Sequence, residues 1–282
     1  MIEELEAGKL PAEEKWKEHI EELCQKTKPS CKEEVKKALI SAVKKRIPKE
    51  KFGLFLSGGV DSSLLAFILK TFTDDFVCYS VGIKGSHDLE AAECAAKKLG
   101  LNWVYKEFSE EETEKILKKT AKMFMKPDVI NVGVGSVFVA AKELAKEKIF
   151  FSGLGSEEIF AGYQRHEKGD ANEECWRGLK MMWQRDLLRD STIAKKLNFS
   201  LRLPFLDDEV ISAAMGIPSE KKINKEHKKI ILREIAEELG LQKEIAWRQK
   251  KAAQYGSGFD KVMEKLAKKK GMRKSEYVSH LT

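Results

Sequence analysis

The spacing of apolar residues along the chain changes near residue 50. Before that point, apolar residues recur three or four positions apart, first as Trp16, Ile20 and Leu23 and then as Val35, Leu39 and Val43. This spacing places them on one face of a helix, and Pro48 is expected to end the pattern. Residues 1–47 are therefore predicted to form an amphipathic helical entry segment rather than a separate domain.

From Phe52 onward, short apolar runs alternate with helical patterns. The runs predict strands at 52–57, 76–81, 102–107 and 148–152, and the stretches between them predict helices at 62–72, 88–99, 110–123 and 136–146. A Val/Gly-rich turn is expected between Pro127 and the last of these helices. Strands that alternate with helices predict a parallel sheet with right-handed crossovers. Past Tyr163 the strand pattern fades, and helices are expected at 172–190, 207–215, 226–239 and 258–270.

The turn after the first predicted strand carries candidate chemistry. It follows Leu56 and reads Ser57-Gly58-Gly59-Val60-Asp61-Ser62-Ser63. Glycines allow the backbone to take left-handed angles and to bring amide groups against an anion, and serines add hydroxyl donors. The positive end of the next helix points at the same place. Asp61 would repel a bound phosphate unless a divalent cation lay between them, so the turn predicts a phosphate site that uses Mg²⁺.

A second glycine turn follows the strand predicted at 148–152. It reads Ser152-Gly153-Leu154-Gly155-Ser156-Glu157-Glu158. Open parallel sheets bind their ligands at the carboxyl ends of the strands. The two turns are therefore expected to face one nucleotide from the same edge of the sheet.

The composition bears on the binding partners and the cellular location of the protein. Charged residues make up 34% of the 282 residues, and the net charge is +7. The dense basic cluster at 261–274 lacks interleaved aromatic residues, which favours a solvated terminal helix over an RNA-binding tail. The five cysteines show no C-x-x-C spacing and fit a reducing compartment. Because no apolar run approaches the about 18–20 residues of a membrane span, a cytoplasmic location is expected.

Five motifs extend the pattern over most of the chain. They are, in order, LFLSGGVDSS, YSVGIKGSHDLEAA, FFSGLGSEEIFAGY, LRLPFLDDEV, and ILREIAEELG with IAWRQKKAAQYGSG. The first turn resembles the SGGxDS signature of the PP-loop ATP pyrophosphatases. The whole set resembles the synthetase domain of the asparagine synthetases and of the related β-lactam synthetases. This resemblance implies an adenine nucleotide alpha hydrolase-like fold with three parts: the segment 1–47, a nucleotide-binding α/β core at 48–165 and a helical region at 166–282 that completes the active site.

The same resemblance implies the roles of particular residues. ATP would contact the backbone of Val81 and, in the two turns, Leu56, Ser57, Gly58, Gly59, Asp61, Ser62, Ser63, Ser152 and Gly153. Asp61 and Glu157 would hold Mg²⁺, with Glu157 at a position where the family usually has aspartate. Lys250 would neutralise the polyphosphate and the departing pyrophosphate, and Glu158 matches the family's next acidic residue and is the second catalytic candidate.

Other polar residues are expected to serve the structure. The pairs Arg202 with Asp207 and Arg189 with Asp190 flank helix starts, where such pairs often fix the local backbone. The five histidines show no spacing typical of metal ligands, and no chemistry is assigned to them.

Two departures from the family pattern bear on the second substrate. About fifty residues precede the first turn, too few for a glutaminase domain of about 200 residues. Nitrogen is therefore expected from ammonia, from a separate glutaminase subunit or from an amine on the substrate. Leu154 stands where asparagine synthetases have a glutamate and lactam-forming relatives a tyrosine that helps to deprotonate or position the amine, and leucine can do neither. Glu158 or Tyr163 takes over this role, the nucleophile needs no base, or the substrate is not aspartate.

The sequence thus predicts an ATP-dependent ligase that adenylates a carboxylate, releases pyrophosphate and passes the acyl group to nitrogen. Formation of asparagine from aspartate is the leading case. Other PP-loop proteins activate other acids or a tRNA base, and the positive charge and Leu154 motivate that alternative. A catalytically idle nucleotide-binding regulator is a third hypothesis, and the sequence leaves a tRNA partner and a homo-oligomer open.

Overall fold

The computed structural model describes residues 1–249 and 252–281. Its centre is a five-stranded sheet in the order β3-β2-β1-β4-β5, in which each neighbouring pair is parallel. The strands are β1 (Phe52–Phe55), β2 (Phe76–Ile83), β3 (Trp103–Phe108), β4 (Ile149–Phe151) and β5 (Ser200–Arg202). The predicted α/β fold with a parallel sheet is confirmed. The short strand β5 lies in the region where the sequence predicts only helices, so that part of the prediction is wrong.

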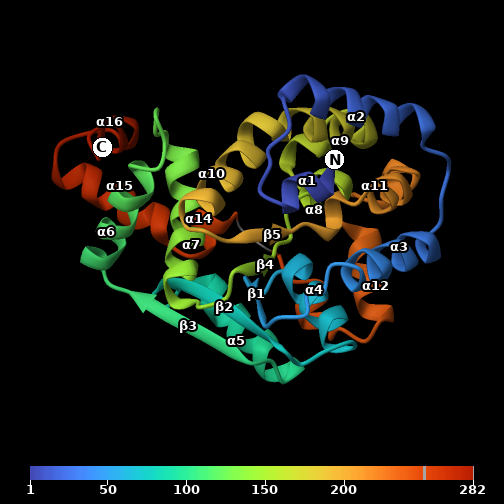
Figure 1. Cartoon of the computed structure of the whole chain (residues 1–282), viewed down its shortest axis with the longest axis horizontal. Coiled ribbons are helices and arrows are strands. Elements are labelled where there is room, and N and C mark those ends of the chain that lie inside the picture. Colours follow the sequence, from blue (N-terminus) through green and yellow to red (C-terminus); the bar gives the residue numbers. More distant parts are fainter. Residues whose placement is uncertain (250–251, 282) are drawn as a thin grey trace.

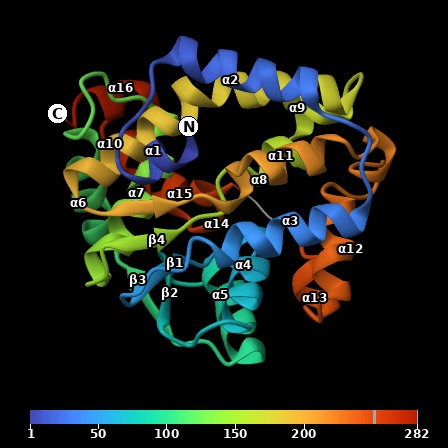
Figure 2. The ribbon, with the colours of Figure 1, turned by 45° about the vertical axis from the view of Figure 1, so that its right-hand side comes forward.

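Four helices make the crossovers from β1 to β4. They are α4 (Val60–Lys70), α5 (His87–Leu99), α6 (Glu110–Ala121) and α7 (Val129–Leu144). Figure 2 shows α4 and α5 on one side of the strands and α7 on the other. The central strands are thus covered on both faces, which explains why β1, β2 and β4 read as continuous apolar runs. The edge strand β3 is partly exposed.

The prediction of a turn between Pro127 and residue 136 is wrong, because α7 begins at Val129. Asp128 caps this helix: its Oδ1 accepts hydrogen bonds from the amides of Ile130 and Asn131, at 2.8 and 2.9 Å. An aspartate at this position satisfies amide groups that a helix start leaves without partners. The cap therefore outweighs the low helix propensity of the valines and glycines that follow.

The other helices lie before β1 and after β4. They are α1 (Ile2–Glu6), α2 (Glu13–Lys26), α3 (Lys32–Lys44), α8 (Ser156–Ile159), α9 (Ala171–Met182), α10 (Leu188–Lys196), α11 (Asp208–Met215), α12 (Ile230–Glu238), α13 (Lys243–Ala246), α14 (Ala253–Gly256), α15 (Phe259–Lys269) and α16 (Lys274–Ser279). The helix predicted at 172–190 is divided by a π-helical turn at Trp183–Leu187. Figure 1 shows α2 running along α9, far from the sheet.

Long-range polar contacts fasten the N-terminal helices to the later part of the chain. The indole nitrogen of Trp16 in α2 donates a hydrogen bond of 2.8 Å to the carbonyl of Leu179 in α9. Arg46 donates to Glu6 at 2.6 Å in a partly buried contact and to Asp207 at 2.7 Å in a buried one. The arginine that pairs with Asp207 is therefore Arg46. Asp207 also caps α11 by accepting from the amide of the second helical residue, as its place at a helix start predicts.

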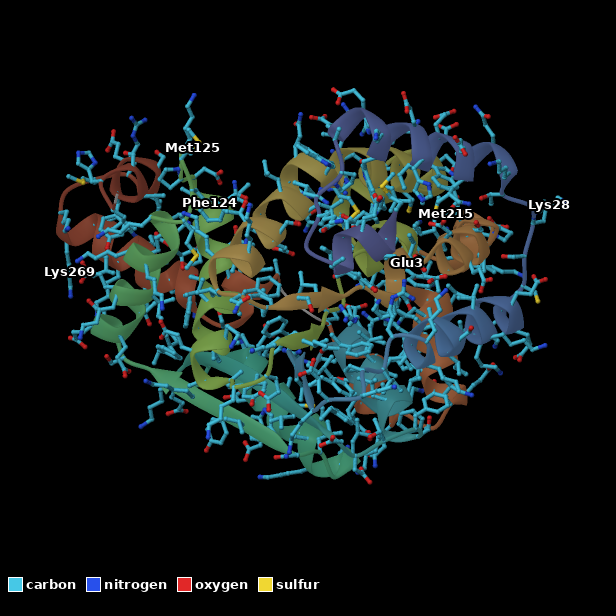
Figure 3. The ribbon with its side chains drawn as sticks, in the orientation of Figure 1. Glu3, Lys28, Phe124, Met125, Met215 and Lys269 are labelled. Carbon is cyan, nitrogen blue, oxygen red and sulfur yellow. The ribbon has the colours of Figure 1, made fainter. Side chains whose placement is uncertain are left out.

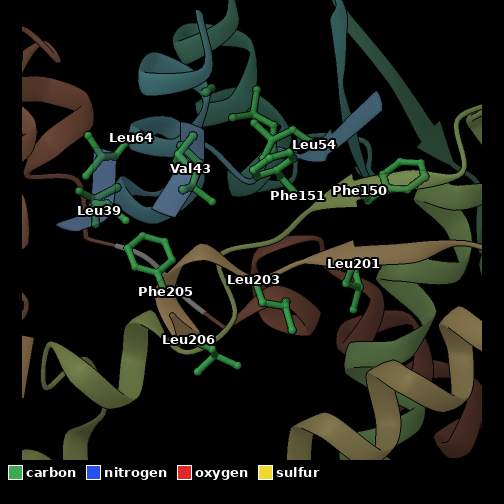
Figure 4. Close-up of a cluster of buried hydrophobic side chains, with 14 of the residues drawn as sticks. Leu39, Val43, Leu54, Leu64, Phe150, Phe151, Leu201, Leu203, Phe205 and Leu206 are labelled. Atoms are coloured by element: carbon green, nitrogen blue, oxygen red, sulfur yellow. The ribbon is translucent and has the colours of Figure 1, made fainter. Parts of the chain in front are cut away.

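The hydrophobic core fills the space between the sheet and the helices. Figure 4 shows Phe150 and Phe151 of β4 beside Leu54 of β1, with side chains of α3 and α4 packed nearby. The ring of Phe150 lies over Gly53, where a Cβ would approach its Cε1 to 2.3 Å. Glycine at this position thus leaves room for the ring to pack over β1.

The surface is polar except at a few isolated points. Figure 3 shows Met125 projecting from the turn between α6 and α7, and this side chain is fully exposed. The basic segment at 261–274 forms α15 and the start of α16, with Met263 and Leu266 buried and the lysines outside, as the sequence predicts for a solvated terminal helix. Within residues 1–249 and 252–281, no helix has the length and apolar character needed to cross a membrane.

Gly53→Ala is expected to lower the free energy of unfolding by about 1–3 kcal/mol, because the added methyl group would collide with the Phe150 ring. Gly133→Ala in α7 is the control, since its Cβ would come no closer than 3.4 Å to another residue. Alanine in place of a helical glycine stabilises by about 0.5–1 kcal/mol. Urea unfolding followed by circular dichroism measures both variants, and an undiminished stability of Gly53→Ala would contradict the close packing at this strand pair.

Candidate active site

The two glycine turns lie side by side because β1 and β4 are neighbours. Leu54 of β1 pairs with Phe151 of β4, so both strands reach the carboxyl edge of the sheet together. A cavity of about 240 Å³ opens there, and each turn contributes part of its wall: Leu56, Ser57, Asp61 and Ser62 from the first, and Ser152, Gly153, Leu154 and Glu157 from the second. The two turns face one cavity, as their positions at the strand ends predict.

The first turn is shaped by its glycines in two different ways. Gly58 has a φ of 66°, in the left-handed region, and a Cβ there would lie 2.3 Å from the backbone of Ala91. Gly59 has a φ of −81° and precedes the first residue of α4, so it uses no conformation that other residues avoid. The left-handed angle is needed at Gly58 alone. The hydroxyl of Ser62 accepts a hydrogen bond of 3.1 Å from the amide of Ser57, which closes the turn.

Asp61 lies at the start of α4 and is held in a buried ion cluster. Its Oδ1 and Oδ2 accept hydrogen bonds from the ammonium of Lys229 at 2.7 and 2.9 Å. The same ammonium lies 2.8 Å from Oε1 of Glu157 in the second turn and 3.3 Å from the hydroxyl of Ser156. One cation thus joins the two turns. Asp61 also accepts from the Ser156 hydroxyl.

Lys229 is a residue of the site that the sequence does not reveal. It precedes α12 with a φ of 57°, an angle that non-glycine residues seldom adopt, and its side chain is 5% exposed. Burial acts to lower the pKa of Lys229, but the carboxylates of Asp61 and Glu157 offset this effect and raise the pKa overall. The ammonium therefore stays charged. A strained backbone that holds a buried cation against two carboxylates is typical of a functional site.

The donor set at this point fits a magnesium ion that is shared with a substrate. Among the described residues, no group of three or more His, Cys, Asp and Glu side chains is placed to hold a metal. Asp61 and Glu157 supply two carboxylates, and Mg²⁺ in nucleotide sites usually takes one or two carboxylates and fills its other positions with phosphate and water. The Glu157 side chain is 28% exposed, so it is accessible from the cavity side.

One part of the cavity wall is apolar. It is formed by Val81 of β2 and by four residues of α7, namely Val134, Val137, Phe138 and Ala141. Val81 is 4% exposed, and its backbone belongs to the sheet beside β1. An apolar wall next to a strand edge suits a flat heterocycle, because the ring faces pack on aliphatic and aromatic carbon while backbone groups satisfy the ring edge.

Another part of the cavity wall is charged and is built by α10 and the turn before it. Asp186, Arg189 and Asp190 supply the charged groups, and Leu154 of the second turn lines the same cavity. Arg189 donates from Nε to Asp190 at 2.6 Å and from an Nη atom to Asp186 at 3.1 Å. The expected pairing of Arg189 with Asp190 is confirmed. Both residues also line the cavity.

Glu158 is not among the cavity-lining residues of the described chain. Its side chain is 1% exposed and pairs with Arg185, whose guanidinium lies 5.2 Å from the ring centre of Tyr163. Burial, together with the nearby carboxylate of Asp186, raises the pKa of Glu158 to about 7. Tyr163 does line the cavity. Glu158 therefore fixes Arg185 beside the Tyr163 ring. It does not line the cavity, where a catalytic residue is expected to lie.

Two predicted residues remain, Ser63 and Lys250. The hydroxyl of Ser63 is buried in α4 without a hydrogen-bond partner among the described residues, and it does not reach the cavity. Lys250 falls outside the described residues. Just before it, Arg248 donates to the carbonyl of Ser57 at 3.3 Å and to the carbonyl of His87 at 3.0 Å, and so ties the first turn to α5. Arg248, the second residue of the WRQKK motif, thus contacts the first glycine turn.

A second cavity of about 430 Å³ adjoins the first. Asp61, Glu157, Tyr163 and Ala252 line both cavities. The second cavity is bounded by Lys229, Arg233 and Gln249 and by polar residues near 224–228. The ion cluster therefore stands between an apolar-walled cavity and a polar one, where a charged chain that leaves the first cavity would enter the second.

Comparison with known proteins identifies the family of the chain. The family model described as asparagine synthase matches residues 34–177 and 166–280. The protein named “Putative asparagine synthetase (glutamine-hydrolyzing) 1” of Methanocaldococcus jannaschii is 35% identical over 286 residues, which cover 86% of this chain and 52% of that protein. Human asparagine synthetase (glutamine-hydrolyzing) is 32% identical over 257 residues, which cover 85% of this chain and 45% of that protein. The chain spans about half the length of these relatives.

Among solved structures, the NMN synthetase of Francisella tularensis aligns with 89% of this chain and 92% of its own, with 14% identity and a TM-score of 0.44.

The stability of this region is expected to depend on pH through His166, which lies beside Tyr163 and is 1% exposed. Burial, with nearby Arg165 and Lys222, lowers the pKa of His166 to about 3. Its Nδ1 accepts from the Tyr163 amide at 3.0 Å. Because the unfolded chain binds a proton below the ordinary pKa of about 6.5 and the folded chain does not, stability is full above that pH and falls as the pH drops toward 3.

His166→Gln is therefore expected to lose less stability than the wild type when the pH is lowered from 7.5 to 5.0. Urea unfolding at the two pH values measures the difference. His280→Gln, which alters an exposed ring near the C-terminus, is the matched control and is expected to follow the wild type. An identical pH dependence in His166→Gln and wild type would show that this histidine takes up its proton in the folded state.

Proposed function

The chain belongs to the asparagine synthase family, and from this membership we propose that it is an ATP-dependent ligase. It adenylates a carboxylate, releases pyrophosphate and transfers the acyl group to nitrogen. One observation supports the proposal above all: the two glycine turns, 95 residues apart, converge on one cavity and are joined by the ammonium of Lys229 between Asp61 and Ser156. Because the chain spans about half of its relatives, the acid and the nitrogen donor are part of the proposal.

The proposed site divides ATP between the two adjoining cavities. The adenine ring packs on Val81 and Phe138 in the apolar part of the wall, and the turn at Ser57 to Ser62 surrounds the phosphates with amide and hydroxyl groups. The positive end of α4 points at the same phosphates. The β and γ phosphates extend past Asp61 toward Lys229, where the second cavity begins.

Charge neutralisation is the main contribution of the protein to the first half-reaction. Attack of the substrate carboxylate on the α phosphorus builds negative charge on the departing pyrophosphate. Lys229, which is charged and fixed by two carboxylates, stabilises that charge without reorganising. Asp61 and Glu157 would hold Mg²⁺, which supplies Lewis-acid neutralisation of the phosphates when bound.

The substrate acid is proposed to lie against the charged part of the cavity wall. Arg189 carries a guanidinium there, and Asp186 and Asp190 pair with it, so that this part of the wall suits a zwitterion with both a carboxylate and an ammonium group. Aspartate, with asparagine as the product, is the leading candidate. The nitrogen is proposed to come from ammonia or from a separate glutaminase.

Lys229→Met is expected to lower acid-dependent ATP–pyrophosphate exchange by about 100-fold or more, because the charge on the leaving group loses its fixed counterion. The matched control is Lys221→Met, which removes an exposed lysine of the same segment and is expected to leave exchange unchanged. The measurement is incorporation of labelled pyrophosphate into ATP with aspartate and other amino acids. Exchange at the wild-type rate in Lys229→Met would contradict the role proposed for the ammonium.

Asp61→Asn and Lys250→Ala are each expected to abolish the same exchange. The first removes the carboxylate that pairs with Lys229 and would bind magnesium, and the second removes the lysine that the family resemblance places at the polyphosphate. Asp74→Asn, a change of an exposed aspartate in the turn after α4, controls for the loss of one aspartate. Far-ultraviolet circular dichroism checks that each variant is folded, and a folded variant that retains exchange removes that residue from the proposed site.

A further inference from the structure

We propose that Arg233 is a further catalytic residue, which donates from Nη2 to the departing pyrophosphate in the second cavity. The inference rests on the proposed ligase function, in which the β and γ phosphates pass Asp61 and enter that cavity. It adds a second fixed cation to the one that Lys229 provides.

Arg233 lies beside Lys229 in the wall of the second cavity. Both residues line this cavity of about 430 Å³, together with Asp61 and Glu157 of the two glycine turns. The amide of Arg233 donates a hydrogen bond of 3.0 Å to the carbonyl of Lys229, so the two residues are one helical turn apart at the start of α12. Residues with this spacing are neighbours on a helix surface, and an anion held by one can also contact the other.

Three carbonyl groups hold the guanidinium of Arg233. Its Nε donates to the carbonyl of Lys228 at 2.7 Å, and its Nη1 donates to the carbonyls of Ala246 and Arg248 at 2.6 and 3.0 Å. The remaining nitrogen, Nη2, has no hydrogen-bond partner among the described residues, and it is not one of the enclosed polar atoms that lack a partner. Nη2 is thus fixed by the bonds of the other two nitrogens and is accessible to a ligand.

The charge of Arg233 has no carboxylate partner among the described residues, unlike the charges of the two lysines before it. Lys228 pairs with Glu167 at 2.6 Å, and Lys229 pairs with Asp61 at 2.7 Å. Arg233 is 7% exposed and bonds only to neutral carbonyl groups. Buried charges are usually paired, so the charge of this guanidinium remains available to an anionic ligand.

Burial makes this charge sensitive to an anion in the cavity. It lowers the pKa of Arg233, and the carboxylates of Asp61 and Glu157 oppose the effect. Arginine nevertheless keeps its proton at neutral pH. Because the guanidinium is largely removed from water, an anion that contacts Nη2 gains more than it would at an exposed arginine.

The chemistry of the leaving group fits this donor. In the proposed first half-reaction, a carboxylate oxygen forms a bond to the α phosphorus, the bond from that phosphorus to the bridging oxygen breaks, and its electron pair leaves with pyrophosphate. A guanidinium donates well to phosphate oxygens, and a donor already fixed where charge appears stabilises it without reorganising. Arg233 and Lys229 thus share the charge of one leaving group.

Binding of pyrophosphate tests the assignment without any substrate acid. Isothermal titration calorimetry of the full chain with magnesium pyrophosphate is expected to give a Kd about tenfold or more higher for Arg233→Gln than for the wild type, the usual effect of losing one hydrogen bond to a charged group. Arg202→Gln is the matched control and is expected to keep the wild-type Kd. Arg202 also donates to carbonyl groups, those of Glu6 and Leu201, but it lines neither of the two adjoining cavities.

Arg233→Lys separates contact with the ligand from support of the backbone. A single ammonium cannot hold three carbonyls, so both variants are expected to lose similar stability in urea unfolding. The lysine keeps a positive charge in the cavity wall, however, and is expected to give a Kd between those of the wild type and Arg233→Gln. If Arg233→Gln does not fold, Arg233→Lys alone is compared with the wild type, and its Kd is expected to be severalfold higher.

The outcomes distinguish this inference from the function on which it rests. A wild-type Kd in Arg233→Gln, or in Arg233→Lys where only that variant folds, would overturn the role of Arg233 and leave the ligase function in place. Equal Kd values for the lysine and glutamine variants would show that the residue acts through the backbone alone. A wild-type protein that binds no pyrophosphate would refute the proposed leaving group, and with it the contact that Arg233 would make.

Discussion

The parallel pairing of β1 with β4 is the constraint on which the rest of the structure depends. The chain leaves β1 for β2 on one side and returns to β4 on the other, so the crossovers diverge and a crevice opens at the carboxyl edge between these strands. Gly53 allows the Phe150 ring to lie over the pair, and the turns that follow the strands begin at the same level. Two glycine turns remote in sequence thereby become the two walls of one cavity.

The ion cluster at Lys229 adds a second constraint, because it is formed by segments 168 residues apart. Breaking a buried ion pair by removal of one partner usually costs about 3–5 kcal/mol. The helical region that carries Lys229 therefore stabilises the first turn as well as covering it, and a chain without that region would leave Asp61 and Glu157 close together with uncompensated charge. Assembly of the site and folding of the C-terminal helices are thus linked by electrostatics.

The sequence predicts the parts of this arrangement that are local. The strand, glycine turn and helix at 52–70 are specified by apolar pattern and backbone freedom, and so is the second turn after β4. Long-range pairings between side chains are not predicted by the sequence. Nothing in the composition distinguishes Lys229 among 52 lysines and arginines, or identifies Arg46 as the partner of Asp207. The sequence does not predict β5 for another reason, because three residues are too few for alternation to be recognised.

The buried position of Lys229 creates two opposite electrostatic demands. In the proposed reaction, departure of pyrophosphate adds negative charge, so a fixed cation is needed where the phosphates leave, and Lys229 lines the second cavity, on that side of Asp61. Burial by itself lowers the pKa of a lysine and would favour loss of its proton. The carboxylates of Asp61 and Glu157 offset this effect and raise the pKa of Lys229 overall. The acidic residues of the two turns therefore keep the cation charged, and because the same carboxylates would also hold Mg²⁺, one cluster holds two of the positive charges that the phosphates need.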